Sequence, residues 1–195
     1  NRVKVSASLK IAVAGLGTVG AGLLRLISEH SEDLSLRAGR RIEFTAISAR
    51  NRKADRGVDI TPYAWHDDPI SLAGDPDIDV VVELIGGSDG IAKALIEAAI
   101  ENGKHVVTAN KAVLAIHGEE LFQVASEHGR NLYYEASVAA AVPILQVLQQ
   151  GIPAGPVDRL TGILNGTCNF ILGRLEHLSF DDSVAEAQSA GLAEA

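Results

Sequence analysis

The chain has 195 residues, of which 47% are hydrophobic, and it carries a formal net charge of −8 with histidine taken as neutral. The apolar fraction supports a globular protein whose length suits one full domain and part of a second, and the acidic charge excludes a typical binder of duplex nucleic acid. Because no apolar run approaches the roughly 20 residues that cross a bilayer, and the first ten residues lack a signal-peptide core, we expect a cytoplasmic protein without a membrane segment.

The first predicted elements are a strand, a glycine-rich turn and a helix. Residues 9–14 form a short apolar run typical of a buried parallel strand, and apolar side chains recur at helical spacing over residues 23–27. Between them lies the hexapeptide Gly15-Leu16-Gly17-Thr18-Val19-Gly20. Gly15 permits a tight turn, Gly17 lets a pyrophosphate approach the backbone, and Gly20 allows close packing of helix on strand. Such a turn can need glycine without any ligand, but the strand and helix around it favour a dinucleotide site at the helix start.

The second predicted strand bears on the choice of cofactor. Residues 42–48 alternate well enough for a strand, and Arg50 follows where an NAD enzyme usually places an acidic side chain against the ribose 2′-hydroxyl. With Arg52 and Lys53 nearby, a 2′-phosphate would find positive charge, so the sequence favours NADP(H) over NAD(H). The alternative is an ordinary solvated basic loop.

Three more strands are predicted, over residues 77–84, 105–108 and 131–135, with helical segments between them. The first of these stops at Gly86-Gly87, and Asn102-Gly103 is a C-cap signal for the helix that follows. This alternation of strand and helix predicts an α/β fold, with a doubly wound parallel sheet of the Rossmann type.

Lys111 is a candidate site residue because of its position. With Asn110 it follows the strand over residues 105–108 at the carboxyl end, where open α/β sheets bind their ligands. A lysine there could bind a substrate carboxylate, steer a carbonyl group or contact the nicotinamide side of the cofactor. The alternative is a solvated loop lysine.

Glu135 ends the last predicted strand, with two tyrosines before it and small apolar residues after it. A carboxylate in an apolar setting needs partners. Backbone carbonyl groups of residues 137–143 could complete an oxygen-ligated cation site with it, or Glu135 could form a salt bridge to a neighbouring residue. The spacing favours neither alternative.

The composition changes to small residues from Ala136 onward, so we predict a cofactor domain over residues 1–136 and a second domain that begins within residues 137–195. In this second part the sequence predicts a strand over residues 159–164 and a helix over residues 168–176. About 60 residues lie near the lower limit for an independent core, so we expect them to belong to a larger domain or an oligomer interface.

Cys168 is the single cysteine, which excludes an intramolecular disulfide framework and a thiolate cluster for zinc. Its apolar surroundings predict a buried residue without a chemical role. Methionine is absent, even at residue 1, and we therefore expect the chain to be incomplete.

Six segments, taken in order, resemble homoserine dehydrogenases. They are GLGTVG, VVELIGG, HVVTANKA, YYEASVAAAVPI, GILNGTCNFIL and AGLAEA. The resemblance runs from about Lys10 to the last residue, and the block GILNGTCN is far more specific than a glycine loop. It implies a Rossmann domain followed by part of an α+β catalytic and dimerisation domain. The implied reaction is NAD(P)H-dependent reduction of aspartate 4-semialdehyde to L-homoserine, on the route to threonine, methionine and isoleucine.

The resemblance also implies roles for individual residues. Besides the loop glycines, cofactor contacts would fall on Leu16, Thr18, Val19, Arg50, Gly86, Lys111 and Gly191. A monovalent cation, usually sodium in the family, would be held by Glu135 and the backbone oxygens of Val138, Ala140 and Val142. Glu194 would bind homoserine, and a homodimer or higher homo-oligomer is expected.

The family pattern continues to an aspartate that binds substrate and a lysine that donates the proton, and we expect both to lie beyond Ala195. In the implied mechanism, hydride from the nicotinamide attacks the aldehyde carbon while that lysine protonates the developing alkoxide. Lys111 would then assist through its charge and position.

Two other functions fit the same motifs. One is a regulatory module that holds NADP(H) but performs no chemistry. The other is a Rossmann oxidoreductase that acts on another small aldehyde or hydroxy acid. NADPH consumption with aspartate 4-semialdehyde and with no other aldehyde would eliminate this last possibility.

Overall fold

The computed structural model describes residues 8–139, 142–151, 155–163 and 165–192. The chain divides into two compact units, the first ending at Ala140 and the second beginning at Ala141. Within the described residues, no helix has both the length and the apolar character required to cross a membrane.

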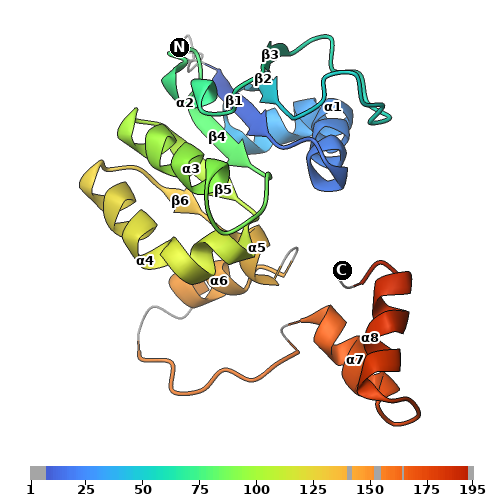
Figure 1. Cartoon of the computed structure of the whole chain (residues 1–195). Coiled ribbons are helices and arrows are strands. Elements are labelled where there is room, and N and C mark those ends of the chain that lie inside the picture. The colour runs from blue at the N-terminus through green and yellow to red at the C-terminus, as the bar shows by residue number, and fades with distance from the viewer. Residues whose placement is uncertain (1–7, 140–141, 152–154, 164, 193–195) are drawn as a thin grey trace. The chain divides into compact units, whose positions relative to one another are not determined.

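The first unit is built on a six-stranded sheet with the order β3-β2-β1-β4-β5-β6. Every pairing between neighbouring strands is parallel. The strands are β1 (Leu9–Ala14), β2 (Ile42–Ser48), β3 (Ala64–His66), β4 (Val80–Glu83), β5 (His105–Thr108) and β6 (Leu132–Tyr133). The chain runs outward from β1 to β3 and then returns to the other side of β1 with β4, as Figure 1 shows. This order confirms the predicted doubly wound Rossmann sheet.

Helices cover both faces of this sheet. They are α1 (Thr18–Ala38), α2 (Ser71–Gly74), α3 (Ile91–Glu101), α4 (Lys111–Glu127) and α5 (Glu135–Ala139). Ala12 and Ala14 of β1 pack in one core with α2, α3 and α4, whereas Val13 between them packs in a second core with Leu24 of α1. Because side chains alternate along a strand, β1 contributes to both layers and is buried on both faces.

Some element boundaries differ from those predicted. The strand predicted over residues 77–84 is β4, which begins only at Val80. Asp75 forms a turn before it, because its side chain accepts a hydrogen bond from the Asp77 N–H and its carbonyl oxygen accepts one from the Ile78 N–H. The strand predicted over residues 131–135 is shorter in the structure, where β6 covers only Leu132–Tyr133. Glu135 is the first residue of α5 rather than the end of a strand. The short elements β3 and α2 were not predicted.

The regular elements described in the second unit are all helices, and residues 155–163 form no regular element. Its elements are α6 (Ile144–Gln146), the π-helix η1 (Val147–Gly151), α7 (Gly166–Arg174) and α8 (Phe180–Ser189). The helices α7 and α8 pack together, with an ion pair of 2.9 Å between Arg174 and Glu186. The helix predicted over residues 168–176 therefore exists but begins at Gly166.

Two predictions for this unit were wrong. Residues 159–163 form no strand, since this segment has no neighbouring strand to pair with in the described part of the unit, and residue 164 lies outside the described residues. Cys168 is exposed rather than buried, because nothing described in its unit packs over that side of α7. Leu160, Ile163 and Leu172 are exposed as well, so α7 and α8 alone do not bury the apolar side chains of this unit.

Candidate functional site

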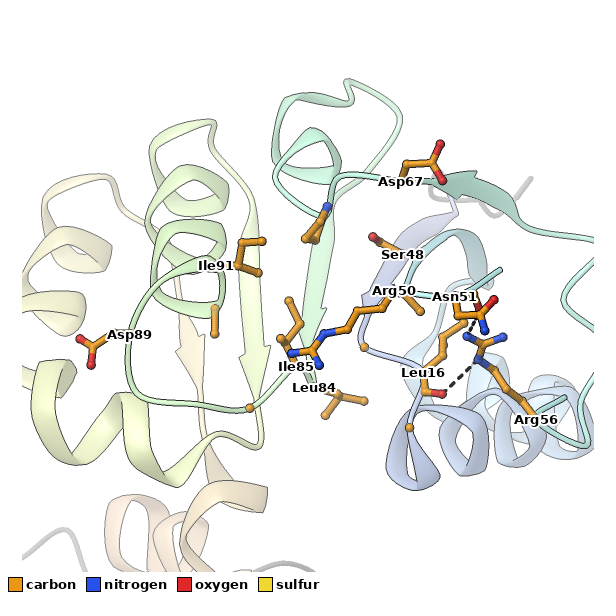
Figure 2. A pocket seen from close by; sticks show the side chains of 16 residues that line it. Leu16, Ser48, Arg50, Asn51, Arg56, Asp67, Leu84, Ile85, Asp89 and Ile91 are labelled. Atoms are coloured by element: carbon orange, nitrogen blue, oxygen red, sulfur yellow. Dashed lines mark hydrogen bonds between the residues drawn. The ribbon is translucent and has the colours of Figure 1, made fainter. Parts of the chain in front are cut away.

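A pocket of about 570 Å³ lies at the carboxyl ends of β1, β2 and β4. Its lining residues are 15–17, 48–51, 84–86, Arg56, Asp67, Pro69, Asp89, Ile91 and Ala92 (Figure 2). The strand order reverses between β1 and β4, and open α/β sheets bind ligands in the crevice that such a reversal creates. The sheet therefore brings the glycine turn, the end of β2 and the turn after β4 to one site.

The three glycines of the turn have different environments. A Cβ built on Gly15, whose φ is +99°, would collide with the carbonyl oxygen of Leu84, and one built on Gly20 would collide with the carbonyl oxygen of Gly15. At Gly17 a Cβ would meet nothing within 4 Å, although this residue lines the pocket. The fold itself thus requires glycine at Gly15 and Gly20, whereas at Gly17 it leaves open space.

The residues between these glycines are only partly at the pocket. Leu16 lines it, but its side chain packs in the core with 6% exposure, so a ligand would meet its backbone. Thr18, Val19 and Gly20 form the first turn of α1 and are not among the described lining residues. Gly17 is the N-cap of α1 and forms no side-chain cap, and no acidic side chain lies in the first turn. This helix start can therefore receive an anion.

Arg50 lines the pocket just after β2, and its side chain extends across toward Ile85 in Figure 2. No hydrogen bond or ion pair joins its guanidinium group to another residue in the described part of the chain. Arg52 and Lys53, which the sequence placed beside it, are exposed and do not line the pocket. Of the three predicted cations, only Arg50 is placed to meet a ligand there.

Arg56 is a lining residue that the sequence reasoning missed. Its guanidinium group donates hydrogen bonds to three backbone carbonyl oxygens, those of Leu16, Asn51 and Ala54. Two of these bonds are drawn in Figure 2. The side chain also lies over the Trp65 ring of β3, with 5.9 Å to the centroid. Arg56 thus ties the loop after β2 to the glycine turn.

The two acidic residues that line the pocket are engaged by other side chains. The carboxylate of Asp67 accepts a hydrogen bond of 2.7 Å from Trp65 Nε1. Asp89 accepts hydrogen bonds from His117 Nε2 at 2.9 Å and from Ser88 Oγ at 2.8 Å. The bond from His117, followed by that from Ser88, lowers the pKa of Asp89 below its usual value.

Lys111 is the first residue of α4, and its side chain is exposed. Asn110 caps this helix by accepting a hydrogen bond from the Val113 N–H at 3.1 Å, and its amide group donates to the Gly87 carbonyl oxygen at 2.8 Å. Lys111 therefore stands at the carboxyl edge of the sheet as predicted, but it is not among the described residues that line the pocket.

The turn after β4 depends on a buried acid. Gly86 lines the pocket and Gly87 follows it, with φ of +81° and +86°. The backbone N–H groups of Ile85 and Gly86 both donate to Glu83, whose side chain is fully buried. In the sequence this glutamate stands in an apolar strand segment, and nothing in that context indicates its role.

Comparison with known proteins agrees with this geometry. Residues 15–135 match the family model described as homoserine dehydrogenase, NAD binding domain, and residues 143–195 match the model described as homoserine dehydrogenase. The chain belongs to the homoserine dehydrogenase family.

Individual members of the family match along nearly the whole chain. The homoserine dehydrogenase of Pseudomonas aeruginosa is 46% identical over 191 residues, which cover 96% of this chain and 43% of that protein. The Bacillus subtilis homoserine dehydrogenase is 36% identical over 190 residues, which cover 96% of this chain and 44% of that protein. The crystal structure of a homoserine dehydrogenase from Thiobacillus denitrificans has a TM-score of 0.88 at 40% identity, covering 97% of this chain and 44% of that one. The chain thus spans less than half the length of these relatives.

The residues that the family resemblance assigns to a cation are only partly described. Glu135 begins α5, Val138 lies in the last turn of this helix, and Ala140 lies outside the described residues. Val142 belongs to the second unit, and its carbonyl oxygen accepts a hydrogen bond from Ile144 at 2.8 Å.

The family segments of the second unit meet each other. Asn165 caps α7 by accepting a hydrogen bond from the Cys168 N–H, and Thr167 Oγ1 donates to the carbonyl oxygen of Leu192. Residues 165–169 and 190–192, which belong to two of these segments, therefore lie together, with Gly191 in a left-handed conformation at φ +69°. Glu194, the predicted substrate ligand, lies outside the described residues.

Proposed function

We propose that this chain forms the cofactor-binding part of a homoserine dehydrogenase that reduces aspartate 4-semialdehyde to L-homoserine and prefers NADP(H). The observation that carries the proposal is the pocket itself, because the unhindered Gly17 at a helix start and a cation, Arg50, after β2 both line it. The product would serve the synthesis of threonine, methionine and isoleucine.

The proposed cofactor uses three features of the pocket. The pyrophosphate lies against Gly17 and the first N–H groups of α1, whose dipole favours an anion. The 2′-phosphate pairs with the Arg50 guanidinium group, which has no competing partner among the described residues. In this proposal, the nicotinamide end of the bound cofactor lies beyond Gly86.

The bound nicotinamide would supply the hydride for the aldehyde carbon. Lys111 is the residue of this chain proposed to assist, by neutralising the substrate carboxylate or by orienting the carbonyl oxygen with its ammonium group. Asn110 fixes the backbone from which Lys111 projects, through its bonds to Val113 and Gly87. Gly191 is proposed to contact the nicotinamide region and Glu194 the substrate.

A monovalent cation, sodium in this proposal, would be held by Glu135 and by the backbone oxygens of Val138, Ala140 and Val142. The donors fit a hard cation, because they combine one carboxylate with carbonyl oxygens. Val138 lies in the final turn of α5, where carbonyl groups lack a helical N–H partner. The cation would support the chain between α5 and α6 rather than take part in hydride transfer.

We also propose that residues 1–136 act as the cofactor domain and that residues 137–195 belong to a catalytic domain that forms a homodimer or higher homo-oligomer. The support is the apolar surface of the second unit, where Leu160, Ile163 and Phe180 are exposed. Apolar side chains in this number usually pack against further protein.

Cofactor titration tests the proposal. The protein is titrated with NADPH and NADH by following nicotinamide fluorescence, as wild type and as Arg50→Asp, with Arg52→Asp as the matched control because Arg52 is exposed and does not line the pocket. We expect Arg50→Asp to weaken NADPH binding about tenfold or more and to leave NADH binding within about twofold. An unchanged NADPH preference in Arg50→Asp would overturn the cofactor assignment. In an assay of the full-length protein, NADPH oxidation with another aldehyde but not with aspartate 4-semialdehyde would overturn the substrate, and NADPH binding with no turnover would favour a binding module.

A further inference from the structure

Glu83 is the last residue of β4 and is fully buried, with 0% exposure. It is paired in register with Ala14 of β1 on one side and with Thr108 of β5 on the other. The three residues before it are valines that fill the core. A buried carboxylate is costly unless hydrogen bonds replace its water, so its partners indicate what it does here.

One carboxylate oxygen of Glu83 holds the turn that lines the cofactor pocket. Oε1 accepts hydrogen bonds from the backbone N–H groups of Ile85 at 2.7 Å and Gly86 at 3.2 Å. Glu83 itself does not line the pocket, whereas Leu84, Ile85 and Gly86 do. The carboxylate therefore shapes this wall of the pocket from behind.

The other oxygen reaches the neighbouring strand. Oε2 accepts a hydrogen bond of 2.6 Å from Thr108 Oγ1, and the same hydroxyl group accepts one of 3.0 Å from the Asn110 N–H. Asn110 in turn donates to the Gly87 carbonyl oxygen, which closes a ring of hydrogen bonds between the two loops. Lys111 is the next residue after Asn110.

We propose that Glu83 is a positioning residue that holds the Gly86 turn and, through Thr108 and Asn110, the start of α4 with Lys111 in a single arrangement that binds the nicotinamide cofactor. The proposal rests on the proposed function, because it concerns the same pocket. The turn after β4 has few constraints of its own, because Gly86 and Gly87, which both have positive φ, lack side chains that would restrict the backbone. The buried ring supplies the rigidity, and networks of this kind act as units.

A purely structural role would make the same residues matter for folding alone. Lys104 distinguishes the two cases, because it is buried at 5% exposure and lies just before β5, at the opposite end of the same strand pair. Its ammonium group donates to the carbonyl oxygens of Asp75 and Ile78, ahead of β4. Removing these bonds should lower stability without touching the pocket.

The experiment compares NADPH dissociation constants and unfolding midpoints for wild type and four variants. The variants are Glu83→Gln, Thr108→Val, Thr108→Ser and Lys104→Met. Both carboxylate oxygens of Glu83 accept hydrogen bonds, and Glu83→Gln replaces one of them with an NH2 group that can only donate. Thr108→Val removes the hydroxyl group at nearly constant volume, whereas Thr108→Ser retains it. We expect Glu83→Gln and Thr108→Val to bind NADPH about tenfold more weakly, with Thr108→Ser and Lys104→Met within about twofold of wild type.

Each outcome decides a different point. If wild type fails to bind NADPH, the proposed function falls and this inference falls with it. If wild type binds and Thr108→Val binds equally well, only the positioning role of Glu83 is overturned. If Lys104→Met weakens binding as much as Glu83→Gln, the effect is general destabilisation and the inference is again overturned. Should Glu83→Gln fail to fold, the comparison of Thr108→Val with Thr108→Ser decides the question.

Discussion

Arg56 Nε donates a hydrogen bond of 3.1 Å to the carbonyl oxygen of Leu16, and so joins the loop after β2 to the glycine turn after β1. The same guanidinium group also donates to the carbonyl oxygens of Asn51 and Ala54, in the loop that directly follows Arg50. The positive charge of Arg56 is thus directed at backbone carbonyl groups of the protein itself. This bond sets the distance between the phosphate turn and the residue proposed to meet the 2′-phosphate.

Replacing Arg56 with alanine should weaken NADPH and NADH binding to a similar degree, because both cofactors share the pyrophosphate that the turn receives. We also expect a loss of about 2 kcal/mol in the free energy of unfolding, since three carbonyl groups lose a charged donor. Calorimetric titration with each cofactor and a urea unfolding curve measure the two effects. Arg52→Ala is the control, because Arg52 also lies over Trp65, at 5.7 Å, but does not line the pocket. A loss confined to NADPH would show that Arg56 binds the 2′-phosphate directly.

The glycines of the turn should separate folding from binding. Gly20→Ala introduces a collision with the Gly15 carbonyl oxygen and should lower the free energy of unfolding by about 3 kcal/mol. Gly17→Ala meets no protein atom and has an ordinary φ of −75°, so the fold should persist while NADPH binding weakens about tenfold. Gly22 lies within α1, and a Cβ there would also meet no protein atom, so Gly22→Ala should leave NADPH binding unchanged. Normal NADPH affinity in Gly17→Ala would contradict the assignment of the pyrophosphate to this position.

The ion pair between Asp89 and His117 should respond to acid. The folded protein holds the pKa of Asp89 below its ordinary value of about 3.9, mainly through the hydrogen bond from His117. The stability contributed by this shift is therefore present above the ordinary pKa and is lost as the pH falls through the lowered one. Carboxyl carbon NMR titration of Asp89 should show the lowered pKa, and His117→Phe should move it back toward the ordinary value. An unchanged Asp89 titration in His117→Phe would show that this bond does not form in solution.

Sodium should stabilise the protein through Glu135. We expect the unfolding temperature to rise when sodium chloride replaces choline chloride at equal ionic strength, and Glu135→Gln to abolish most of that rise. Differential scanning calorimetry in the two salts measures it. Glu127→Gln is the control, since Glu127 is an exposed acid at the end of α4. A rise of the same size in Glu135→Gln would remove Glu135 from the proposed cation site.

Local patterns in the chain were enough to predict the first unit. The apolar run over residues 9–14, the glycines after it and the helical spacing beyond them specify strand, turn and helix through contacts between near neighbours. The position of Arg50 after β2 could be read in the same way, because the end of a strand is a local feature. The short β3 was missed, since three residues carry too little pattern to be separated from a loop.

Residues whose roles depend on distant partners could not be found in this way. Glu83 has the sequence context of a core strand, and only the pairing of β4 with β5 shows that Thr108 faces it. Arg56 has the context of a basic loop, and only the folded loop carries it back to Leu16. Cys168 was predicted to be buried from its apolar neighbours, yet burial depends on what packs against a helix, which those neighbours do not specify.

The sequence by itself determined the class of parallel Rossmann sheet, the glycine turn and the family, because each is encoded in residue types at short, fixed spacing. Only the tertiary structure decided which cations reach the pocket, which glycines are required by packing and which acid supports the turn after β4. These properties arise from contacts between segments that lie tens of residues apart, such as Gly15 with Leu84 and Glu83 with Thr108. The register of the sheet creates these contacts, and local patterns do not specify them.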